Sequence, residues 1–199
     1  MTATTLSELP TLFHKFKVAK KVLDRVSIWN GDITKLAVDA IVNAANNRLA
    51  GGGGVDGAIH LAAGRSELRA ECRQYNGCAV GDAVITSGCK IAHIKKIIHT
   101  VGPQAFGRVN DDLRESLIVC YRTSLDIAIE NGMKSVAFCC ISTGVYGYPN
   151  DDAAKSVTKF LTEFLEKDKL DRIVLVTFLD IDYELYNKYF ADYAASKIE

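Results

Sequence analysis

Two glycine-rich loops carry residue types that could bind an anion. The first contains four consecutive glycines, residues 51–54, and runs through Val55, Asp56 and Gly57 into a helical pattern. Glycine loses more backbone freedom on folding than any other residue, so such a run needs either a tight turn with positive φ or N–H groups that approach a ligand closely. For this loop alone, a flexible linker and a simple helix start stay open as alternatives.

The second loop, residues 141–149, follows an apolar strand pattern and precedes the start of a helix. It places two glycines, Gly144 and Gly147, beside the small hydroxyls of Ser142 and Thr143. Free N–H groups and a helix dipole converge in that context, which suits a phosphate. A hydrogen bond to a charged oxygen contributes ~1.5 to 3 kcal/mol and a solvated point charge ~1 kcal/mol. Several backbone N–H groups can therefore dominate the binding of a diphosphate.

Known nucleotide-binding motifs do not explain these loops. Gly52, Gly54 and Gly57 match the spacing G-x-G-x-x-G, but a Rossmann motif begins where a strand ends and requires an acidic residue after a second strand ~20 residues later. Here the strand pattern ends about eight residues too early, and residues 71–77 are polar and helical. The chain also lacks a Gly-Lys-Ser/Thr sequence, which excludes a P-loop.

The cysteines and histidines give no catalytic or metal-binding pattern. No motif places a His or Asn beside Cys139 and Cys140, and free cysteines are commonly buried, so we interpret both as core residues. His93 and His99 lack metal-ligand spacing, and no metal is predicted. His60 lies four residues after an aspartate on one predicted helix, where it either faces the site or packs between elements.

Short apolar runs alternate with helical spacing along the chain. The runs predict strands at residues 26–29, 40–42, 83–86, 96–99, 135–139 and 173–178. The spacing predicts helices at residues 55–63, 66–74, 112–130, 151–166 and 183–194. This alternation predicts a three-layer α/β/α sandwich around a central mixed β-sheet. Ligands collect beyond the carboxyl ends of strands in such sheets, so we expect a site at the loops after Val42 and Cys140.

The composition is that of one soluble domain. The chain has 199 residues, 48% of them hydrophobic, and its 24 Lys and Arg balance 24 Asp and Glu, so no nucleic-acid partner is expected. Six cysteines without a CxxC pair indicate a reducing compartment. No apolar run approaches the ~18 residues of a membrane span, and the N-terminus lacks a signal-peptide core. We expect a monomer without a membrane partner, in the cytosol or nucleus.

The chain divides into a lead-in and one domain. Residues 1–24 carry several lysines and a single glutamate, which weakly suggests a transit peptide, but a helical lead-in is the favoured interpretation. Residues 25–199 form the predicted domain.

Five motifs in order resemble the macro domain family, and within it the MacroD type. They are residues 30–34, 39–46, 51–60, 98–103 and 141–149, with the sequences NGDIT, DAIVNAAN, GGGGVDGAIH, IHTVGP and ISTGVYGYP. The resemblance runs from about residue 26 to residue 193. It implies that the chain binds ADP-ribose, hydrolyses the ester between ADP-ribose and Asp or Glu side chains of mono-ADP-ribosylated proteins, and needs no cofactor.

The resemblance also implies roles for individual residues. Asp32 would take the adenine amino group, with Ile33 beside the ring and Phe178 stacked on it. Asn46 would hydrogen-bond the distal ribose, and Asp56 would orient or activate the attacking water. The diphosphate and distal ribose would be held by Gly53, Gly54, Val55, Ser142, Thr143, Gly144, Val145 and Tyr146.

The chemistry suits these residue types, because a carboxylate leaves readily and an oriented water needs only partial deprotonation. Three other functions stay open: a non-catalytic reader of ADP-ribosylated proteins, a deacetylase of O-acetyl-ADP-ribose, and a phosphatase that removes a 1″-phosphate. Asn46 with Asp56 favours hydrolysis over reading but does not choose the ester.

Five further residues are interpreted as structural. Asp39 precedes a buried strand, and Trp29 and Phe138 belong to the core. Asp180 and Asp182 follow the last strand, where a helix cap is favoured over a place beside the adenine pocket.

Overall fold

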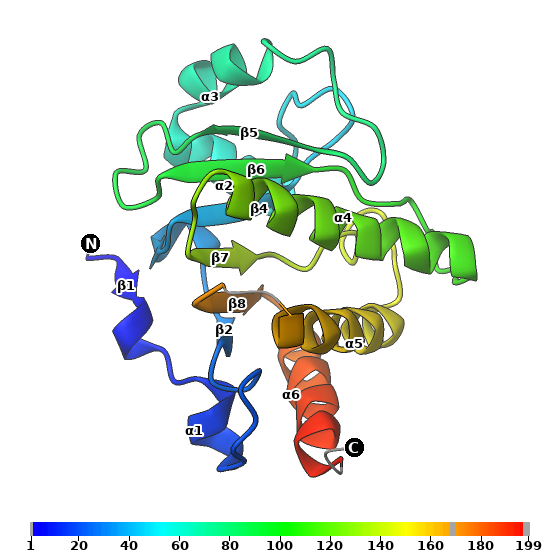
Figure 1. Cartoon of the computed structure of the whole chain (residues 1–199). Helices are drawn as coiled ribbons and strands as arrows, with labels where there is room; N and C mark the ends of the chain where they lie inside the picture. The colour runs from blue at the N-terminus through cyan, green and yellow to red at the C-terminus, as the bar shows by residue number, and fades with distance from the viewer. Residues whose placement is uncertain (1, 168–169, 197–199) are drawn as a thin grey trace.

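The six predicted strands form one sheet at the centre of the protein (Figure 1). The computed structural model describes residues 2–167 and 170–196. The strands are β2 (Val26–Asn30), β4 (Ala40–Ala44), β5 (Ala83–Ser87), β6 (Lys96–Thr100), β7 (Ser135–Phe138) and β8 (Arg172–Thr177). They lie in the order β2-β8-β7-β4-β6-β5, in which β5 and β6 are antiparallel and the other neighbours are parallel.

The parallel strands are apolar because helices cover both faces of the sheet. Ala40, Ile41 and Val42 of β4 are fully buried, and so are Val136 and Phe138 of β7. Such continuous apolar runs are typical of strands that are buried on both sides. The core therefore runs through the middle of the sheet, and Phe138 belongs to it as predicted.

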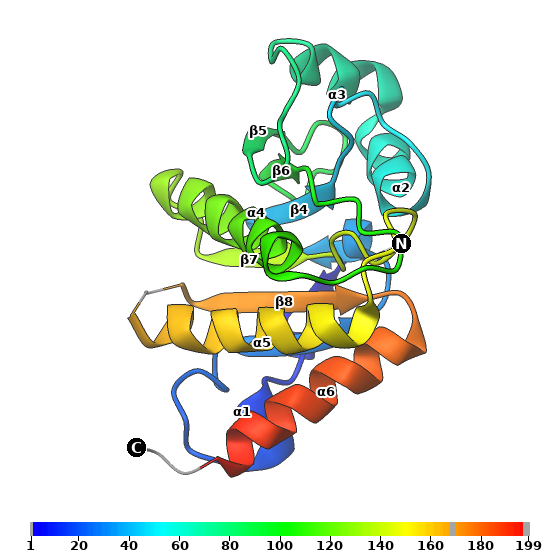
Figure 2. The ribbon, with the colours of Figure 1, turned by 90° about the vertical axis from the view of Figure 1, so that its right-hand side faces the viewer.

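Helices flank the sheet in the predicted three layers. They are α2 (Gly54–Ala63), α3 (Arg65–Cys72), α4 (Asp111–Glu130), α5 (Asn150–Lys167) and α6 (Asp180–Ala195). α4 lies on the face opposite α2 and α3, and α5 packs between α4 and α6 (Figures 1 and 2). Asn110 caps α4, since its side chain accepts a hydrogen bond of 2.8 Å from the Leu113 amide. The mixed α/β/α sandwich is thus confirmed.

The N-terminal lead-in is mostly not helical. Its described part contains a two-residue strand β1 (Thr4–Thr5), which pairs with β3 (Leu36–Ala37), a 3-10 turn η1 (Leu6–Glu8), and one short helix α1 (Leu12–Phe16). Lys17 adopts the left-handed conformation, with φ of 58°, and so ends α1 after five residues. The prediction of a helical lead-in is therefore wrong for most of its described residues. The domain boundary at residue 24 stays a prediction.

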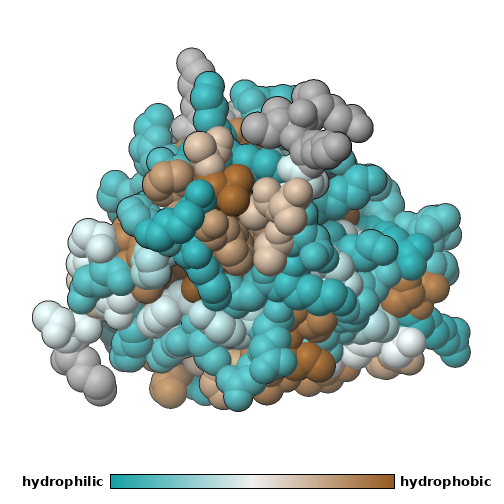
Figure 3. Space-filling model, turned by 90° about the horizontal axis from the view of Figure 1, so that it is seen from below, coloured by the Kyte–Doolittle hydropathy of each residue, from teal (hydrophilic) through white to brown (hydrophobic). Residues whose placement is uncertain are grey.

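The lead-in packs on the rest of the chain. Lys20 Nζ donates hydrogen bonds to the carbonyl oxygens of Tyr193, at 2.5 Å, and Ser196, at 2.9 Å, so it holds the end of α6. Apolar side chains on the face below α1 and α6 are interspersed with hydrophilic ones (Figure 3). Within residues 2–167 and 170–196, no helix has the length and apolarity needed to cross a bilayer.

Candidate functional site

Four neighbouring parallel strands end at one edge of the sheet, and their loops carry the predicted site residues. Along that edge the order is β2, β8, β7 and β4. Asp32 follows β2, Phe178 follows β8, residues 142–146 follow β7, and residues 46–54 follow β4. Strands are spaced by ~4.8 Å, so the four loops span roughly 14 Å. The edge thus offers a linear site in which distant parts of the sequence lie side by side.

At one end of the edge, Asp32 and Phe178 follow a pair of hydrogen-bonded strands. Asp32 is exposed, and its Oδ1 accepts hydrogen bonds from the Thr34 amide, at 2.9 Å, and the Thr34 hydroxyl, at 2.7 Å, which caps η2 (Ile33–Lys35). Ile33 is buried, so its side chain anchors the loop in the core. Phe178 is 85% exposed, which is unusual for a large aromatic side chain.

The loop after β7 is held in a strained, ordered turn. Ser142 is buried with a positive φ of 65°, and its carbonyl accepts a hydrogen bond of 2.9 Å from the Tyr148 amide. The Ala105 amide donates to the Tyr146 carbonyl at 2.8 Å, so the loop is tied to the segment after β6. Val145, at the tip, is 90% exposed. The loop leads into the N-terminus of α5, as expected for an anion cradle.

Three glycines at this edge face open space. A β-carbon built on Gly53, Gly54 or Gly144 would meet no heavy atom within 4 Å. Gly54 has a positive φ of 55°, which explains glycine there, but neither Gly53 nor Gly144 has a positive φ. Neither packing nor a positive φ therefore requires glycine at positions 53 and 144, although Gly53 is also the N-cap of α2, a position that favours glycine. At Gly144, close approach by a ligand would explain the residue.

Asn46 and Asp56 converge on Gly52. A β-carbon at Gly52 would lie 3.2 Å from Asp56 Oδ2 and 3.8 Å from Asn46 Nδ2. Asn46 Nδ2 donates to the Gly51 carbonyl at 3.1 Å, and its Oδ1 accepts from the Arg48 amide at 3.1 Å, so its side chain also shapes the loop. The structure thus brings together the two residues predicted to be catalytic.

Asp56 lies under the first loop in a low-dielectric environment. Its Oδ1 accepts a hydrogen bond of 2.8 Å from Asn43 Nδ2 and lies 3.4 Å from His60 Nε2. Burial raises the pKa of Asp56, although the Asn43 hydrogen bond and the positive charges of Arg65 and Arg69 counteract this effect. Burial also lowers the pKa of His60, so that ring is neutral at neutral pH. A buried carboxylate with a raised pKa is suited to accept a proton.

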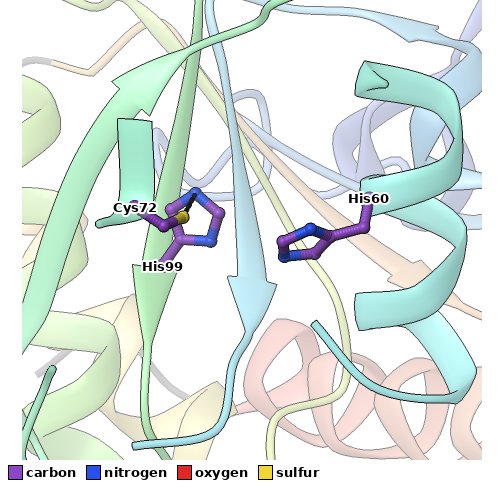
Figure 4. A group of neighbouring side chains, drawn as sticks. All are labelled: His60, Cys72 and His99. Carbon is purple, nitrogen blue, oxygen red and sulfur yellow. Dashed lines mark hydrogen bonds between the residues drawn. The ribbon is translucent and has the colours of Figure 1, made fainter. Parts of the chain in front are cut away.

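His60, Cys72 and His99 form a buried cluster beneath Asp56. His60 points from α2 toward the other two across β4 (Figure 4), and their nearest possible ligand atoms lie within 4.8 Å of one another. Both nitrogens of His99 are engaged, however: Nδ1 lies 3.1 Å from Asn43 Nδ2, and Nε2 lies 3.0 Å from Thr86 Oγ1. Burial raises the pKa of the Cys72 thiol to about 11, which keeps it protonated. These contacts describe a hydrogen-bonded core rather than a set of free metal ligands.

Other side chains considered from sequence have structural contacts. Asp39 Oδ2 accepts hydrogen bonds from the amides of Lys134, at 2.9 Å, and Ser135, at 3.0 Å, which joins the starts of β4 and β7. Cys139 is buried, and burial raises the pKa of its thiol to about 12, which does not suit a nucleophile. Its half-buried neighbour Cys140 packs against the core, and burial raises the pKa of its thiol well above the usual value.

The first turn of α6 contains both acidic residues that follow β8. Asp180 Oδ1 accepts a hydrogen bond of 3.1 Å from Asn30 Nδ2, and Asp182 Oδ1 accepts one of 2.6 Å from Asn150 Nδ2. They therefore connect α6 to β2 and to the start of α5. Neither is the helix cap that the sequence favoured, because the N-cap of α6 is Leu179. Asp180 also lies near the β2 and β8 end of the edge, because Asn30 ends β2.

One contributor to the site was missed from the sequence. Asn43 was assigned no role, although it donates to Asp56. A polar side chain at the end of an apolar strand, directly before the first loop, is the signal that points to Asn43. Trp29, predicted as a core residue, is partly buried and packs against the core, and its ring lies against Gly31, where any β-carbon would clash with it.

The fold and the site define a class: an α/β/α protein with glycine-rich loops along the carboxyl edge of a mostly parallel sheet and a buried carboxylate under one of these loops. The chain belongs to the macro domain family, whose model, described as "Macro domain", matches residues 42–157.

Named relatives are similar to most of this chain. It is 51% identical over 176 residues to the ADP-ribose glycohydrolase MACROD1 of Rattus norvegicus, covering 87% of this chain and 67% of the relative. It is 48% identical over 177 residues to the ADP-ribose glycohydrolase MACROD2 of Xenopus laevis, covering 88% of this chain and 42% of that protein. The chain therefore spans less than half the length of that relative.

Solved structures agree with this family. A Trypanosoma brucei macrodomain in complex with ADP-ribose superposes with a TM-score of 0.85 at 38% identity, over 94% of this chain and 77% of the other. The macro domain of ganglioside induced differentiation associated protein 2 has a TM-score of 0.89 at 29% identity and full coverage of both chains.

Proposed function

We propose that this macro domain binds ADP-ribose along the carboxyl edge of its sheet and hydrolyses the ester that joins ADP-ribose to Asp or Glu side chains of mono-ADP-ribosylated proteins. The observation that carries binding is the open space beside Gly53 and Gly144, where nothing within the described chain requires glycine. The relatives named as ADP-ribose glycohydrolases support the reaction.

The order of the loops matches the order of groups in ADP-ribose. Adenine would lie over Asp32 and Phe178 at the β2 and β8 end. The diphosphate would lie between Val55 of the first loop and the loop after β7, near the α5 N-terminus, whose partial positive charge favours anions. The distal ribose would then reach Asn46 and Tyr146. Ile33, Gly54, Ser142, Thr143 and Val145 complete the proposed contacts.

Asp56 would act on water at the distal ribose. One water attacks C1″, the bond from C1″ to the ester oxygen breaks, and the target carboxylate leaves with the electron pair. The proton of the attacking water passes to Asp56 and then to solvent. The raised pKa of Asp56, caused by burial, improves it as a proton acceptor. Asn46, which faces the same side of Gly52, would hold the ribose hydroxyl in place.

A release assay tests this proposal. The protein is incubated with a target that carries ADP-ribose on a glutamate, and free ADP-ribose is measured; Asp56→Asn and Asn46→Ala are expected to lower the rate by about 100-fold or more. Asp126→Asn, an exposed change on α4, serves as the matched control. Binding of ADP-ribose is followed by calorimetry. Unchanged release in both variants, with binding intact, would show that hydrolysis does not use these residues.

The O-acetyl ester of ADP-ribose is a second substrate that we propose for the same site, because its scissile bond also lies on the distal ribose. Comparing the two substrates in one assay decides which is preferred. Binding without release from either ester would indicate a reader of ADP-ribosylated proteins instead.

A cytosolic or nuclear location is proposed from the cysteines, all six of which are free. Fluorescence microscopy of the tagged protein tests it.

A further inference from the structure

A chain of hydrogen bonds crosses three strands to reach Asp56 from below. It begins at Thr86 on β5, continues through His99 on β6 and Asn43 on β4, and ends at Asp56 on α2. The contacts measure 3.0 Å from Thr86 Oγ1 to His99 Nε2, 3.1 Å from His99 Nδ1 to Asn43 Nδ2, and 2.8 Å from Asn43 Nδ2 to Asp56 Oδ1. All four residues are at least 95% buried, so little water competes for these contacts.

Thr86 fixes which atoms donate and which accept along this chain of hydrogen bonds. Its hydroxyl is within reach of two backbone carbonyls, Ser87 at 3.2 Å and Ile97 at 3.4 Å, and it has one proton to give. Once that proton points to a carbonyl, Oγ1 accepts from His99 Nε2–H. A neutral imidazole with its proton on Nε2 has a lone pair on Nδ1.

His99 is held in that neutral form. Burial and the nearby His60 lower the pKa of His99 to about 3, so the ring does not carry a second proton at neutral pH. Its surroundings supply two further groups: His60 on α2, with ring centres 6.3 Å apart, and Cys72 on α3, whose Sγ is 3.9 Å from Nε2. Glu71 acts on it only as a distant charge.

The lone pair of His99 then orients the amide of Asn43. Both Asp56 Oδ1 and His99 Nδ1 are acceptors, and they face the same end of Asn43. The NH₂ group satisfies both. The flipped amide would place its oxygen against a carboxylate oxygen and a nitrogen lone pair, with repulsion on both sides. In the observed orientation Asn43 Oδ1 has no partner among the described residues, so the two donated bonds outweigh that loss.

We propose that His99 is a positioning residue, which fixes the Asn43 amide so that it donates to Asp56 and keeps this carboxylate aimed at the substrate water. The proposal rests on the proposed function, in which Asp56 is the base. His99 itself does not touch the ligand: it acts only through Asn43.

Three variants test the role of His99 in the release assay over a range of pH. His99→Leu is expected to lower kcat/KM about tenfold at about pH 6 and to move the acidic limb of the pH profile to higher pH, because Asp56 loses its fixed donor. His99→Gln is expected to restore much of the loss, since its amide can accept from Asn43 and donate to Thr86. Cys72→Ala, which removes a neighbour of His99 outside the chain of bonds, is expected to keep the wild-type profile.

Two NMR measurements test the role of His99 even where a variant does not fold. The ¹⁵N chemical shifts of His99 in the wild-type protein are expected to report a proton on Nε2 and none on Nδ1, and ¹³C titration of the Asp56 carboxyl in Thr86→Val is expected to show a higher midpoint than in wild type. A proton on Nδ1, or a wild-type acidic limb in His99→Leu, overturns the proposal. Full release by Asp56→Asn contradicts the proposed function instead, and the two NMR measurements then decide the positioning separately.

Discussion

The backbone of Gly52 lies against the carboxylate of Asp56, so that a β-carbon at position 52 would sit 3.2 Å from Oδ2. The Gly52 carbonyl also approaches Gly57, where a β-carbon would lie only 2.5 Å from that oxygen. The first loop is therefore folded back over the first turn of α2. This contact encloses Asp56 while leaving Gly53 and Gly54 directed at open space.

The glycines that face open space are expected to serve binding. Gly144→Ala should leave the free energy of unfolding unchanged or raise it by up to ~1 kcal/mol, since alanine restricts the unfolded chain. Gly53 is the N-cap of α2, where alanine is disfavoured, so Gly53→Ala should lower it by ~0.5 to 1 kcal/mol. Both variants should bind ADP-ribose about tenfold more weakly, as measured by calorimetry, because the added methyl group occupies the proposed ligand space. Gly57→Ala is the contrast, with an expected loss of ~1 to 3 kcal/mol from overpacking against the Gly52 carbonyl. Equal affinity for ADP-ribose in all four proteins would remove the main support for the binding site.

The buried, ionised carboxylate of Asp56 is expected to lower the stability of the folded protein at neutral pH. Its folded-state pKa is raised by burial, so the unfolded chain ionises first as the pH rises, and wild type loses stability between the unfolded and the folded pKa. The asparagine in Asp56→Asn cannot ionise. The free energy of unfolding of Asp56→Asn should therefore be close to that of wild type at about pH 4 and exceed it by ~1 kcal/mol at about pH 7.5, as measured by urea unfolding. If Asp56→Asn is less stable than wild type at the higher pH, burial of the Asp56 charge does not destabilise the folded protein.

Asp39 is expected to behave in the opposite way. Partial burial alone would raise its pKa, but hydrogen bonds from Lys95, from the Lys134 and Ser135 amides and from the Ser135 hydroxyl lower it overall. A lowered pKa contributes stability that is present above the unfolded value and is lost as the pH falls through the folded value. Asp39→Asn should cost ~1 to 2 kcal/mol at neutral pH, and this difference should shrink in acid.

The control for Asp39 is Asp126→Asn, an exposed change on α4 that should be neutral within ~0.5 kcal/mol. If the two variants unfold alike at every pH, the link between the starts of β4 and β7 does not stabilise the sheet.

Ser142 and Gly102 are expected to be coupled. A β-carbon at Gly102 would collide with Ser142 Oγ and lie 2.7 Å from Ile141 Cγ2, so Gly102→Ala should cost ~2 to 3 kcal/mol. Ser142→Gly relieves a positive φ and removes a buried hydroxyl without a partner among the described residues. The double variant should recover part of the loss, since Ile141 still obstructs the new methyl group. Strict additivity in thermal unfolding would mean that the two positions do not interact.

Local sequence was sufficient to predict the elements and the two loops. Apolar runs such as residues 40–42 and helical spacing such as that of residues 112–130 depend on neighbours within a few residues, so strand and helix bounds agree with the structure to within about three residues. The lead-in was less predictable, because its conformation depends on distant contacts such as Lys20 with the end of α6.

What the sequence by itself determined is therefore the chemistry at each strand end: glycines and hydroxyls after one strand, asparagine and aspartate after another, and an aromatic at the end of the last. Tertiary structure alone decided the strand order that sets these ends side by side, and the register that pairs Asn43 with His99 under Asp56. The reason is physical. Strand order and register follow from the burial of whole faces of the sheet, which sums contacts between residues far apart in the chain, and burial in turn changes the pKa of Asp56.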